Sequence, residues 1–477
     1  MKDLSEEELF DEKSAVAGLT IRQRMPKMSA KERAPIDQYE YPSQECAIRP
    51  GDTLYTLDEQ KFGDVVAADL VARTIDVKKP MKLDGFHATC AFAHTRYPTK
   101  EQSESILRLA QWIVAHEIDD SGQYQAARDL LLRNPPRLIA GQALVNRPNE
   151  TVVQRACRVA LALDNSALPI QGPPGAGKTF TGARMICELV RNGKKVGITA
   201  VSHKVIRKLL DEVVKAAREM NLAVISCAHR KEDADPENQP VREIGANDEA
   251  LASLRSGAVN VLGGTPWLWC REEFRDSIHC LFVDEAGQMS LANVLACSPA
   301  GKNLVLLGDP QQLEQPQKGS HPEGSDISAL AHLLDGRRTI NEEQGLFLAQ
   351  TWRLHPSICS FTSELFYEGR LASLDGLERQ IIEAPGPFVG AGLWFVPVEH
   401  EGNRSYSTEE VERVAMIVEL LTQSGSSWTD RHGRQQALGV NDVMVVAPYN
   451  DQVNRLTERL PDVKVGTVDR FQAELDL

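Results

Sequence analysis

The chain has 477 residues, 42% hydrophobic and 25% charged, which is typical of globular proteins that bury sizeable cores. It has no apolar run near the roughly 18 residues that a membrane span needs, and its acidic start lacks the apolar segment of a secretion signal. The net charge of −14 argues against a surface that binds nucleic acid throughout, although it leaves room for a local basic groove. Nine cysteines without a Cys-x-x-Cys pair predict neither a zinc ribbon nor disulfides, and favour the reducing cytoplasm.

The first 140 residues divide into three predicted parts. Residues 1–45 show no sustained periodicity and predict a linker or extension. Residues 46–98 look β-rich, and segment 64–77 has apolar residues on both sides of a polar middle, which predicts a hairpin in a small β-barrel-like domain. Residues 99–140 predict a helical stalk, because Ile106, Leu109, Ala110 and Ile113 fall three or four apart and a second helix follows over 124–132.

Residues 141–335 alternate between apolar strands and amphipathic helices. Ile206, Leu209, Leu210 and Val213 lie on one face of such a helix. This alternation predicts an α/β fold with a doubly wound parallel sheet, which binds its ligands at the carboxyl ends of the strands. The strand candidates are 167–170, 196–201, 259–262, 280–283 and 304–307.

Residues 336–477 predict a second α/β domain. Its strand candidates are 393–398, 443–447 and 464–468, and Ser407-x-x-Glu410 has the form of a capping box that opens a helix. Three strands are few for a closed α/β core, so we expect this domain to be incomplete.

A phosphate-binding loop is predicted between the strand 167–170 and the helix that follows. Residues 172–179 read GPPGAGKT, which matches G-x-x-x-x-G-K-[ST] in the strand–loop–helix context that the motif requires. Glycines allow backbone N–H groups to surround phosphate oxygens, the lysine reaches the β- and γ-phosphates, and the threonine holds Mg²⁺. The predicted ATP-binding residues here are Gly172, Pro173, Pro174, Gly175, Ala176, Gly177, Lys178, Thr179 and Phe180.

Two further strands end in polar residues that suit the same chemistry. Asp284 and Glu285 follow strand 280–283, where the first carboxylate can bind Mg²⁺ together with Thr179 and the second can act as a base on water. Gln312 follows strand 304–307 and can report whether a γ-phosphate is present. We therefore predict a catalytic set of Lys178, Glu285, Gln312 and, from the resemblance described next, Arg353.

These elements together resemble superfamily 1 helicases, specifically the 5′-to-3′ branch that includes the nonsense-mediated-decay helicase. Seven blocks occur in the family's order between about 150 and 472. The resemblance implies RecA-like P-loop NTPase domains that hydrolyse ATP with Mg²⁺ at their interface and act on a nucleic-acid strand. The blocks are QGPPGAGKT, TAVSHK, LGGTPW, DEAGQ, GDPQQL, the stretch from Gln350 to Leu371, and the pair APYNDQV and VGTVDRFQ.

The resemblance also implies roles for single residues. Gln154 matches the glutamine that reads the adenine edge, and Arg353 matches the arginine that reaches the γ-phosphate from the second domain. Trp352 stands where the family has tyrosine, and its ring either stacks on the base or packs in the core. Four residues fall where the family contacts the strand: Ser202, His203, Thr265 and Asn450.

The regions before and after the seven blocks can also be compared with the family. Residues 46–140 resemble the barrel and stalk that precede the motor in this branch, and the chain is similar to bacterial proteins that fuse a RecB-like nuclease to such a helicase. We find no carboxylate–lysine pattern of a nuclease, so we expect that domain to be absent here. The family continues after Phe-Gln with Gly-x-Glu and an arginine-bearing motif VI, whereas Gln472 is followed by Ala473–Leu477. This departure predicts a truncated second domain, weak ATPase activity and no unwinding.

The leading hypothesis is an ATP-dependent helicase or translocase on single-stranded nucleic acid, DNA rather than RNA, with a role in DNA repair and no membrane partner. The alternative is a truncated module that binds nucleotide and nucleic acid without hydrolysing ATP. A hexameric ring ATPase is disfavoured by the Arg353 block and by GDPQQL.

Overall fold

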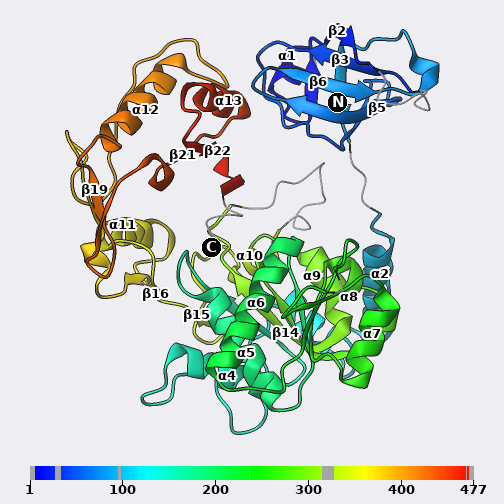
Figure 1. Ribbon diagram of the computed structural model, residues 1–477. Coiled ribbons are helices and arrows are strands. Elements are labelled where there is room, and N and C mark those ends of the chain that lie inside the picture. Colours follow the sequence, from blue (N-terminus) through cyan, green and yellow to red (C-terminus); the bar gives the residue numbers. More distant parts are fainter. Residues whose placement is uncertain are drawn as a thin grey trace. The chain divides into compact units, whose positions relative to one another are not determined.

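The computed structural model describes residues 6–26, 34–94, 98–235, 237–313, 327–468 and 470–471. The chain forms two compact units (Figure 1). One unit is Thr99–Arg379, and the other combines Met1–Pro98 with Gln380–Leu477.

The unit Thr99–Arg379 is built on an eight-stranded sheet in which every pair of neighbours is parallel. The predicted α/β class with a doubly wound parallel sheet is therefore confirmed. In spatial order the strands are β11 (Arg242–Ile244), β10 (Cys227–Arg230), β12 (Val261–Gly263), β9 (Val196–Thr199), β13 (Ile278–Val283), β14 (Gly301–Gly308), β8 (Ala167–Gln171) and β15 (Leu346–Phe347).

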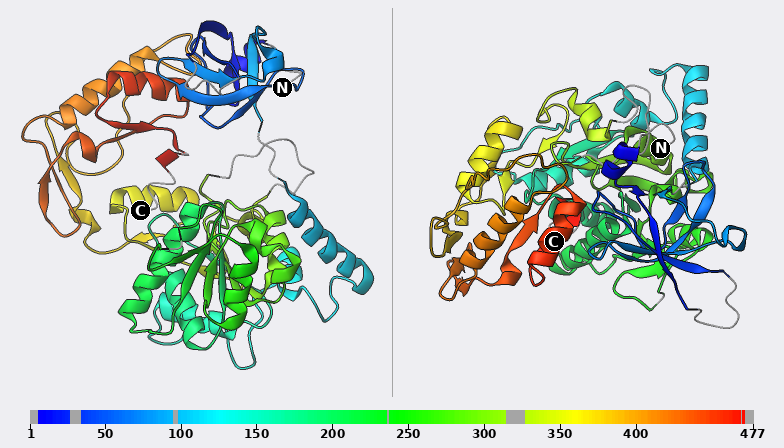
Figure 2. Two further views of the ribbon diagram at one scale, coloured as in Figure 1. Left: turned by 45° about the vertical axis from the view of Figure 1, so that its right-hand side comes forward. Right: turned by 90° about the horizontal axis from the view of Figure 1, so that it is seen from above.

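Helices cover both faces of this sheet (Figures 1 and 2). One buried cluster joins the sheet to α4 (Val152–Ala162), α5 (Lys178–Arg191) and α6 (His203–Glu219). A second cluster joins the opposite face to α2 (Lys100–His116), α3 (Gln125–Leu132), α7 (Asn247–Ser256), α8 (Pro266–Trp269), α9 (Leu291–Cys297) and α10 (Ala329–Leu334).

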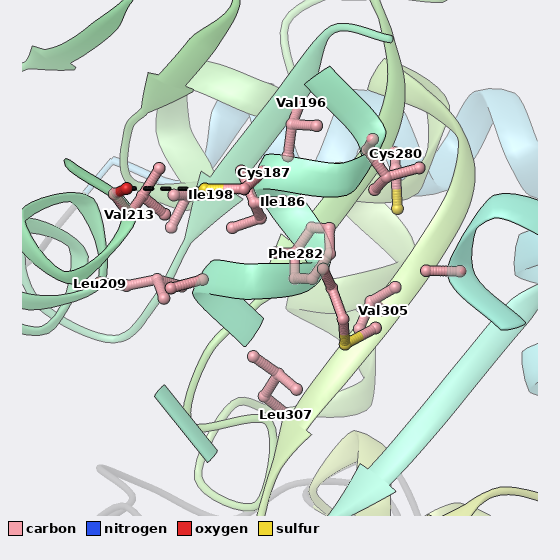
Figure 3. Close-up of a cluster of buried hydrophobic side chains, with 14 of the residues drawn as sticks. Ile186, Cys187, Val196, Ile198, Leu209, Val213, Cys280, Phe282, Val305 and Leu307 are labelled. Carbon is pink, nitrogen blue, oxygen red and sulfur yellow. Dashed lines mark hydrogen bonds between the residues drawn. The ribbon is translucent and has the colours of Figure 1, made fainter. Parts of the chain in front are cut away.

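The sequence pattern explains this packing. The predicted helical face of Ile206, Leu209, Leu210 and Val213 is buried in α6, whereas β13 is apolar along nearly its whole length because both of its faces are covered. Figure 3 shows side chains from both α5 and α6 against the strands, with the Cys187 thiol donating to the Val213 carbonyl at 3.6 Å. This core fixes the strand ends at which the candidate site lies.

The second unit contains a seven-stranded antiparallel sheet, in the order β1 (Ala15–Ala17), β7 (Cys90–Ala93), β4 (Thr53–Tyr55), β5 (Lys61–Asp69), β6 (Thr74–Lys78), β3 (Ile36–Glu40) and β2 (Thr20–Arg24), together with α1 (Glu6–Asp11). The predicted hairpin over 64–77 is confirmed by the pairing of β5 with β6. The prediction of a linker over 1–45 is wrong, since β1, β2 and β3 all belong to this sheet.

A buried ion pair explains why the pattern of β3 was missed. The side chains of Asp37 and Lys79 are fully buried and lie 2.7 Å apart, so a charged residue occupies an inward position of β3. All five residues of β2 are exposed. Neither strand therefore shows the alternation of apolar and polar residues on which the prediction rests.

The predicted second domain over 336–477 is divided differently in the structure. Residues up to Arg379 belong to the unit with the large sheet, because β15 pairs with β8. That part contains β16 (Gln350–Thr351), α11 (Pro356–Phe366) and β17 (Ala372–Ser373). Strand β15, which was not predicted, is thus the edge of the preceding sheet.

Residues 380–468 contain an antiparallel sheet of β18 (Ile381–Glu383), β19 (Ser427–Thr429) and β20 (Gln435–Ala437), and a parallel pair of β21 (Met444–Val446) and β22 (Lys464–Gly466). Helices α12 (Thr408–Leu421) and α13 (Asn450–Arg459) pack on the pair. Ser407 caps α12 by accepting from the Glu410 N–H, as predicted, but the Ser407 N–H donates to the Gln452 side chain, so the reciprocal bond of the predicted capping box is not formed. The predicted strand 393–398 is wrong: the segment is unpaired, Phe395 is 91% exposed, and Pro397 has no N–H to donate.

None of the helices in the described part of the chain combines the length and the apolar character that a membrane span requires.

Candidate functional site

The phosphate-loop sequence forms the connection from β8 to α5, at the carboxyl end of the sheet. Gly175 and Gly177 adopt φ of 72° and 82°, which side chains with a Cβ rarely take. The Lys178 ammonium donates to the Gly172 carbonyl at 3.0 Å, and a Cβ at Gly172 would lie 2.4 Å from the Lys178 side chain. The loop therefore curves around its own lysine, with the N-terminus of α5 behind it.

The segment that carries Arg353 lies directly on this loop. The Thr351 hydroxyl donates to the Pro174 carbonyl at 2.9 Å, and the Trp352 N–H donates to the Gly175 carbonyl at 2.9 Å. A Cβ at Gly175 would come within 2.5 Å of the Arg353 Cβ, so only glycine fits. Arg353 was expected to reach the site from a second domain, but its block belongs to the same unit as the loop.

Two buried carboxylates stand beside the loop at the end of β13. Asp284 is 3% exposed and Glu285 is 7% exposed, with Glu285 in the left-handed region at φ 53°. Burial and the Glu285 carboxylate raise the pKa of Asp284 well above its usual range, and the nearby Lys178 ammonium acts in the opposite direction. The structure thus brings Lys178, Asp284 and Glu285 together, as the sequence predicted.

The loop after β14 brings a third segment to the same edge. The Gly308 carbonyl accepts from the Gly172 N–H at 2.9 Å, and a Cβ at Gly287 would lie 2.5 Å from the Asp309 carbonyl oxygen. The Gln312 amide donates to the Asp309 carboxylate at 3.4 Å. The loops that follow β8, β13 and β14 are therefore packed backbone to backbone.

A cavity of about 810 Å³ opens beside the phosphate loop, with Val152, Phe180, Phe347, Trp352 and Arg370 among its lining. Trp352 is 53% exposed, so the core-packing alternative for this residue is wrong. Gln154 does not line the cavity in this structure. Its side-chain oxygen accepts from the Thr151 N–H at 2.9 Å, which completes the cap of α4.

Three of the four residues expected to contact nucleic acid lie just after the ends of two neighbouring β-strands. Ser202 caps α6 after β9, and Thr265 precedes α8 after β12, which pairs with β9. His203 contacts His229, with a distance of 3.0 Å between ring nitrogens, and burial lowers the pKa of both, that of His229 to about 4. Both rings are therefore neutral at pH 7.

The fourth expected strand contact, Asn450, belongs to the other unit. Its side-chain amide donates to the Glu45 carboxylate, and the neighbouring Asp451 accepts from the Ser43 hydroxyl at 2.8 Å. This contact could not be predicted from local sequence patterns, because Asn450 and Glu45 lie 405 positions apart in the chain.

The residues present fit a magnesium-bound nucleoside triphosphate. Thr179 and Asp284 supply a hydroxyl and a carboxylate, which are hard oxygen ligands of the kind that Mg²⁺ prefers. A Cβ at Gly172 would meet the Lys178 side chain, and one at Gly175 would meet Arg353 and Thr351, so these glycines allow the loop to pack closely around the Lys178 side chain. The predicted phosphate ligands therefore lie between β8 and α5, and the predicted metal ligand Asp284 follows β13 of the same parallel sheet.

Sequence reasoning missed two residues that the structure places at this edge. Tyr367 and Gln171 both donate to the buried Asp309, and Gln171 directly precedes the phosphate loop. Tyr367 falls within the block Gln350–Leu371, and the family resemblance of that block was the one sign in the sequence that Tyr367 belongs to the site.

Comparison with known proteins gives matches along most of the chain. The "DNA replication ATP-dependent helicase/nuclease dna2" of Schizosaccharomyces pombe is 23% identical over 416 residues, covering 80% of this chain and 28% of that protein. The "DNA-binding protein SMUBP-2" of Rattus norvegicus is 24% identical over 443 residues, covering 76% of this chain and 43% of that protein. The chain thus spans less than half of these relatives. Among solved structures, an Arterivirus nonstructural protein 10 (helicase) matches with 13% identity and a TM-score of 0.32, covering 72% of this chain and 58% of that one.

Two family models, each described as an AAA domain, match residues 152–344 and 326–474. The parallel sheet and the phosphate loop at its carboxyl edge define a P-loop ATPase. Within this class, the relatives that the chain is similar to include the SMUBP-2 and dna2 proteins, at 24% and 23% identity.

Proposed function

We propose that this protein is an ATP-dependent helicase or translocase that moves along single-stranded DNA. The observation that carries the proposal is the meeting of Lys178 with Asp284 and Glu285, two buried carboxylates, at the carboxyl edge of one sheet. A buried pair of like charges beside one ammonium is costly by itself, and a divalent cation would stabilise it.

Each residue of this edge has a proposed role in ATP hydrolysis. Lys178 binds the β- and γ-phosphates, and Thr179 with Asp284 holds Mg²⁺, which when bound neutralises charge that develops on the phosphates. Glu285 accepts the proton of the attacking water. Gln312 and Arg353 meet the γ-phosphate, while Gln154 and Trp352 recognise the base.

We place the proposed binding site for single-stranded nucleic acid along the carboxyl ends of β9 and β12. Ser202, His203 and Thr265 lie on these neighbouring ends, and neutral histidine can both donate and accept hydrogen bonds. Asn450 is proposed as a further contact to nucleic acid, once its hydrogen bond to Glu45 opens. DNA is favoured over RNA because both relatives named above have DNA in their names.

The wider setting is also a proposal. The 5′-to-3′ direction follows from the resemblance to that branch of superfamily 1. A role in DNA repair and a RecB-like nuclease partner follow from the resemblance to nuclease–helicase fusions. The nine free cysteines fit a reducing cytoplasm.

Steady-state ATP hydrolysis, measured with and without single-stranded DNA or RNA of equal length, tests the proposal. DNA is expected to stimulate hydrolysis more than RNA does. ATP binding without any hydrolysis, in the presence of either strand, would instead support the non-hydrolysing module. Displacement of a labelled strand from 5′- and 3′-tailed duplexes would then separate unwinding from translocation and report the direction.

A further inference from the structure

Asp309 is a buried carboxylate that is held by hydrogen bonds alone. It is 1% exposed, and no ion pair among the described residues includes it. One carboxylate oxygen accepts from the Tyr367 hydroxyl at 2.7 Å and from the Gln312 amide at 3.4 Å. The other accepts from the Gln311 N–H at 3.2 Å and from the Gln171 amide at 3.4 Å. A buried charge of this kind is stable only while its acceptors are satisfied.

These donors come from three different segments around the nucleotide site. Gln171 ends β8 immediately before the phosphate loop, and its side-chain oxygen also accepts from the Ile340 N–H at 2.8 Å. Gln312 belongs to the loop after β14. Tyr367 follows the last residue of α11, in the block that begins with the Arg353 segment. One carboxylate therefore connects the phosphate loop, the Gln312 loop and α11.

Tyr367 is placed to be the permanent donor of this set. It is 2% exposed, and its ring centroid lies 6.2 Å from that of Phe347, which lines the cavity beside the phosphate loop. Burial, together with the Asp309 carboxylate, raises the pKa of its hydroxyl, so the group stays protonated and continues to donate. Gln312 is half-buried, and its bond to Asp309 is long.

We propose that Tyr367 is a positioning residue that allows Gln312 to leave Asp309 and meet the terminal phosphate of the nucleotide. The inference rests on the proposed ATPase function and on the role of Gln312 in it. When the Gln312 amide turns away, Tyr367 still donates to the same oxygen, so Asp309 stays satisfied. Without the Tyr367 hydroxyl, the departure of Gln312 leaves that oxygen of a buried carboxylate bare, and Gln312 stays on Asp309.

The test is steady-state ATP hydrolysis by the full chain carrying Tyr367→Phe, which removes one oxygen and keeps the ring. We expect kcat/KM to fall about tenfold, mainly through kcat, because the contact of Gln312 with the terminal phosphate is present in bound ATP and strengthens in the transition state. If Tyr367 acts through Gln312, the Gln312→Ala/Tyr367→Phe double variant falls no further than Gln312→Ala alone.

Tyr39→Phe is the matched control. It removes a buried tyrosine hydroxyl with a bond of similar length, 2.8 Å to the His87 ring, in the unit that lacks the phosphate loop. Its kcat is expected to equal that of the wild type, although its melting temperature falls. A purely structural role for Tyr367 would make the two variants behave alike.

Two results would overturn the inference: a Tyr367→Phe variant with wild-type kcat, or losses that multiply in the double variant. If the wild type itself hydrolyses no ATP, the proposed function fails, and the ratio of ATP to ADP affinity then decides the inference separately. The ratio should fall to the same value in Tyr367→Phe and Gln312→Ala. A ratio in Tyr367→Phe equal to that of the wild type would contradict it.

Discussion

Lys178 is the residue on which nucleotide binding is expected to depend most. Its ammonium makes a hydrogen bond to the Gly172 carbonyl within the phosphate loop. We predict that Lys178→Ala weakens ATP binding by at least about tenfold, the scale of one charge-assisted hydrogen bond. Titration with a fluorescent ATP analogue measures it, and Lys215→Ala, an exposed lysine of α6, is the control. If Lys178→Ala binds ATP as tightly as the wild type, the assignment of residues 172–179 as the phosphate-binding loop is wrong.

Glu285 should matter for the chemical step and little for binding. We predict that Glu285→Gln keeps the affinity for Mg·ATP within about twofold and lowers kcat by about 10²–10⁴, because the amide is nearly isosteric but cannot accept the proton. Glu343→Gln, on an exposed carboxylate of the same unit, should leave both values unchanged. If Glu285→Gln instead loses Mg·ATP binding, Glu285 is a ligand or a structural residue.

The sequence alone could identify functional residues that belong to one short motif. The phosphate loop and Asp284–Glu285 are such cases, because spacing within a few residues and the flanking strand define them. Tyr367 could not be found in this way, since its partner Asp309 lies 58 positions away. For Gln154, the family resemblance gave a role in base recognition, whereas the structure shows its oxygen in the cap of α4.

At the scale of elements, the short strand β16 fixes the Arg353 segment on the phosphate loop. The Thr351 hydroxyl is fully buried, donates to the Pro174 carbonyl and accepts from the Arg353 N–H at 3.2 Å. We predict that Thr351→Val lowers the free energy of unfolding by about 1–3 kcal/mol, because these backbone groups lose their partner. Urea denaturation measures this change.

Thr351→Ser, which keeps the hydroxyl, provides the comparison for that variant. It should retain most of the stability and a larger share of the ATPase activity than Thr351→Val. Equal losses in the two variants would show that the methyl group, and not the hydroxyl, matters at this position.

Elements with a clear apolar period were predictable, and those without one were not. Helix α6 and strand β13 follow from their patterns because packing alone decides which of their side chains are buried. Strand β3 was missed because the buried Asp37–Lys79 pair replaces an apolar contact. Strand β15 has two residues, and its pairing with β8 connects positions too far apart in the chain to be read from spacing.

At the scale of the whole molecule, the sequence pattern did not reveal the boundary near Arg379. Apolar spacing continues across it, and the assignment of residues 336–379 depends on β15 and on the contacts of the Arg353 segment with the phosphate loop. All the residues proposed to bind nucleotide therefore fall within Thr99–Arg379, a unit that has hydrophobic clusters of its own.

This division leads to a prediction for the isolated unit. Residues 99–379, expressed alone, should fold cooperatively and bind Mg·ATP with an affinity within about threefold of the full chain, because a domain with its own core can fold independently. Thermal denaturation with and without Mg·ATP measures both properties. A unit that folds but shows no shift with Mg·ATP would mean that residues outside 99–379 contribute to the nucleotide site.

The central claim is that a nucleic-acid strand and the Lys178–Asp284–Glu285 site act together. The most direct measurement is the rate of ATP hydrolysis by the full chain as single-stranded DNA is added, beside the same titration of Glu285→Gln. The account predicts that the wild-type rate rises with DNA to a plateau, whereas the variant binds Mg·ATP and stays flat. Hydrolysis that is indifferent to DNA, or a Glu285→Gln variant as active as the wild type, would contradict it.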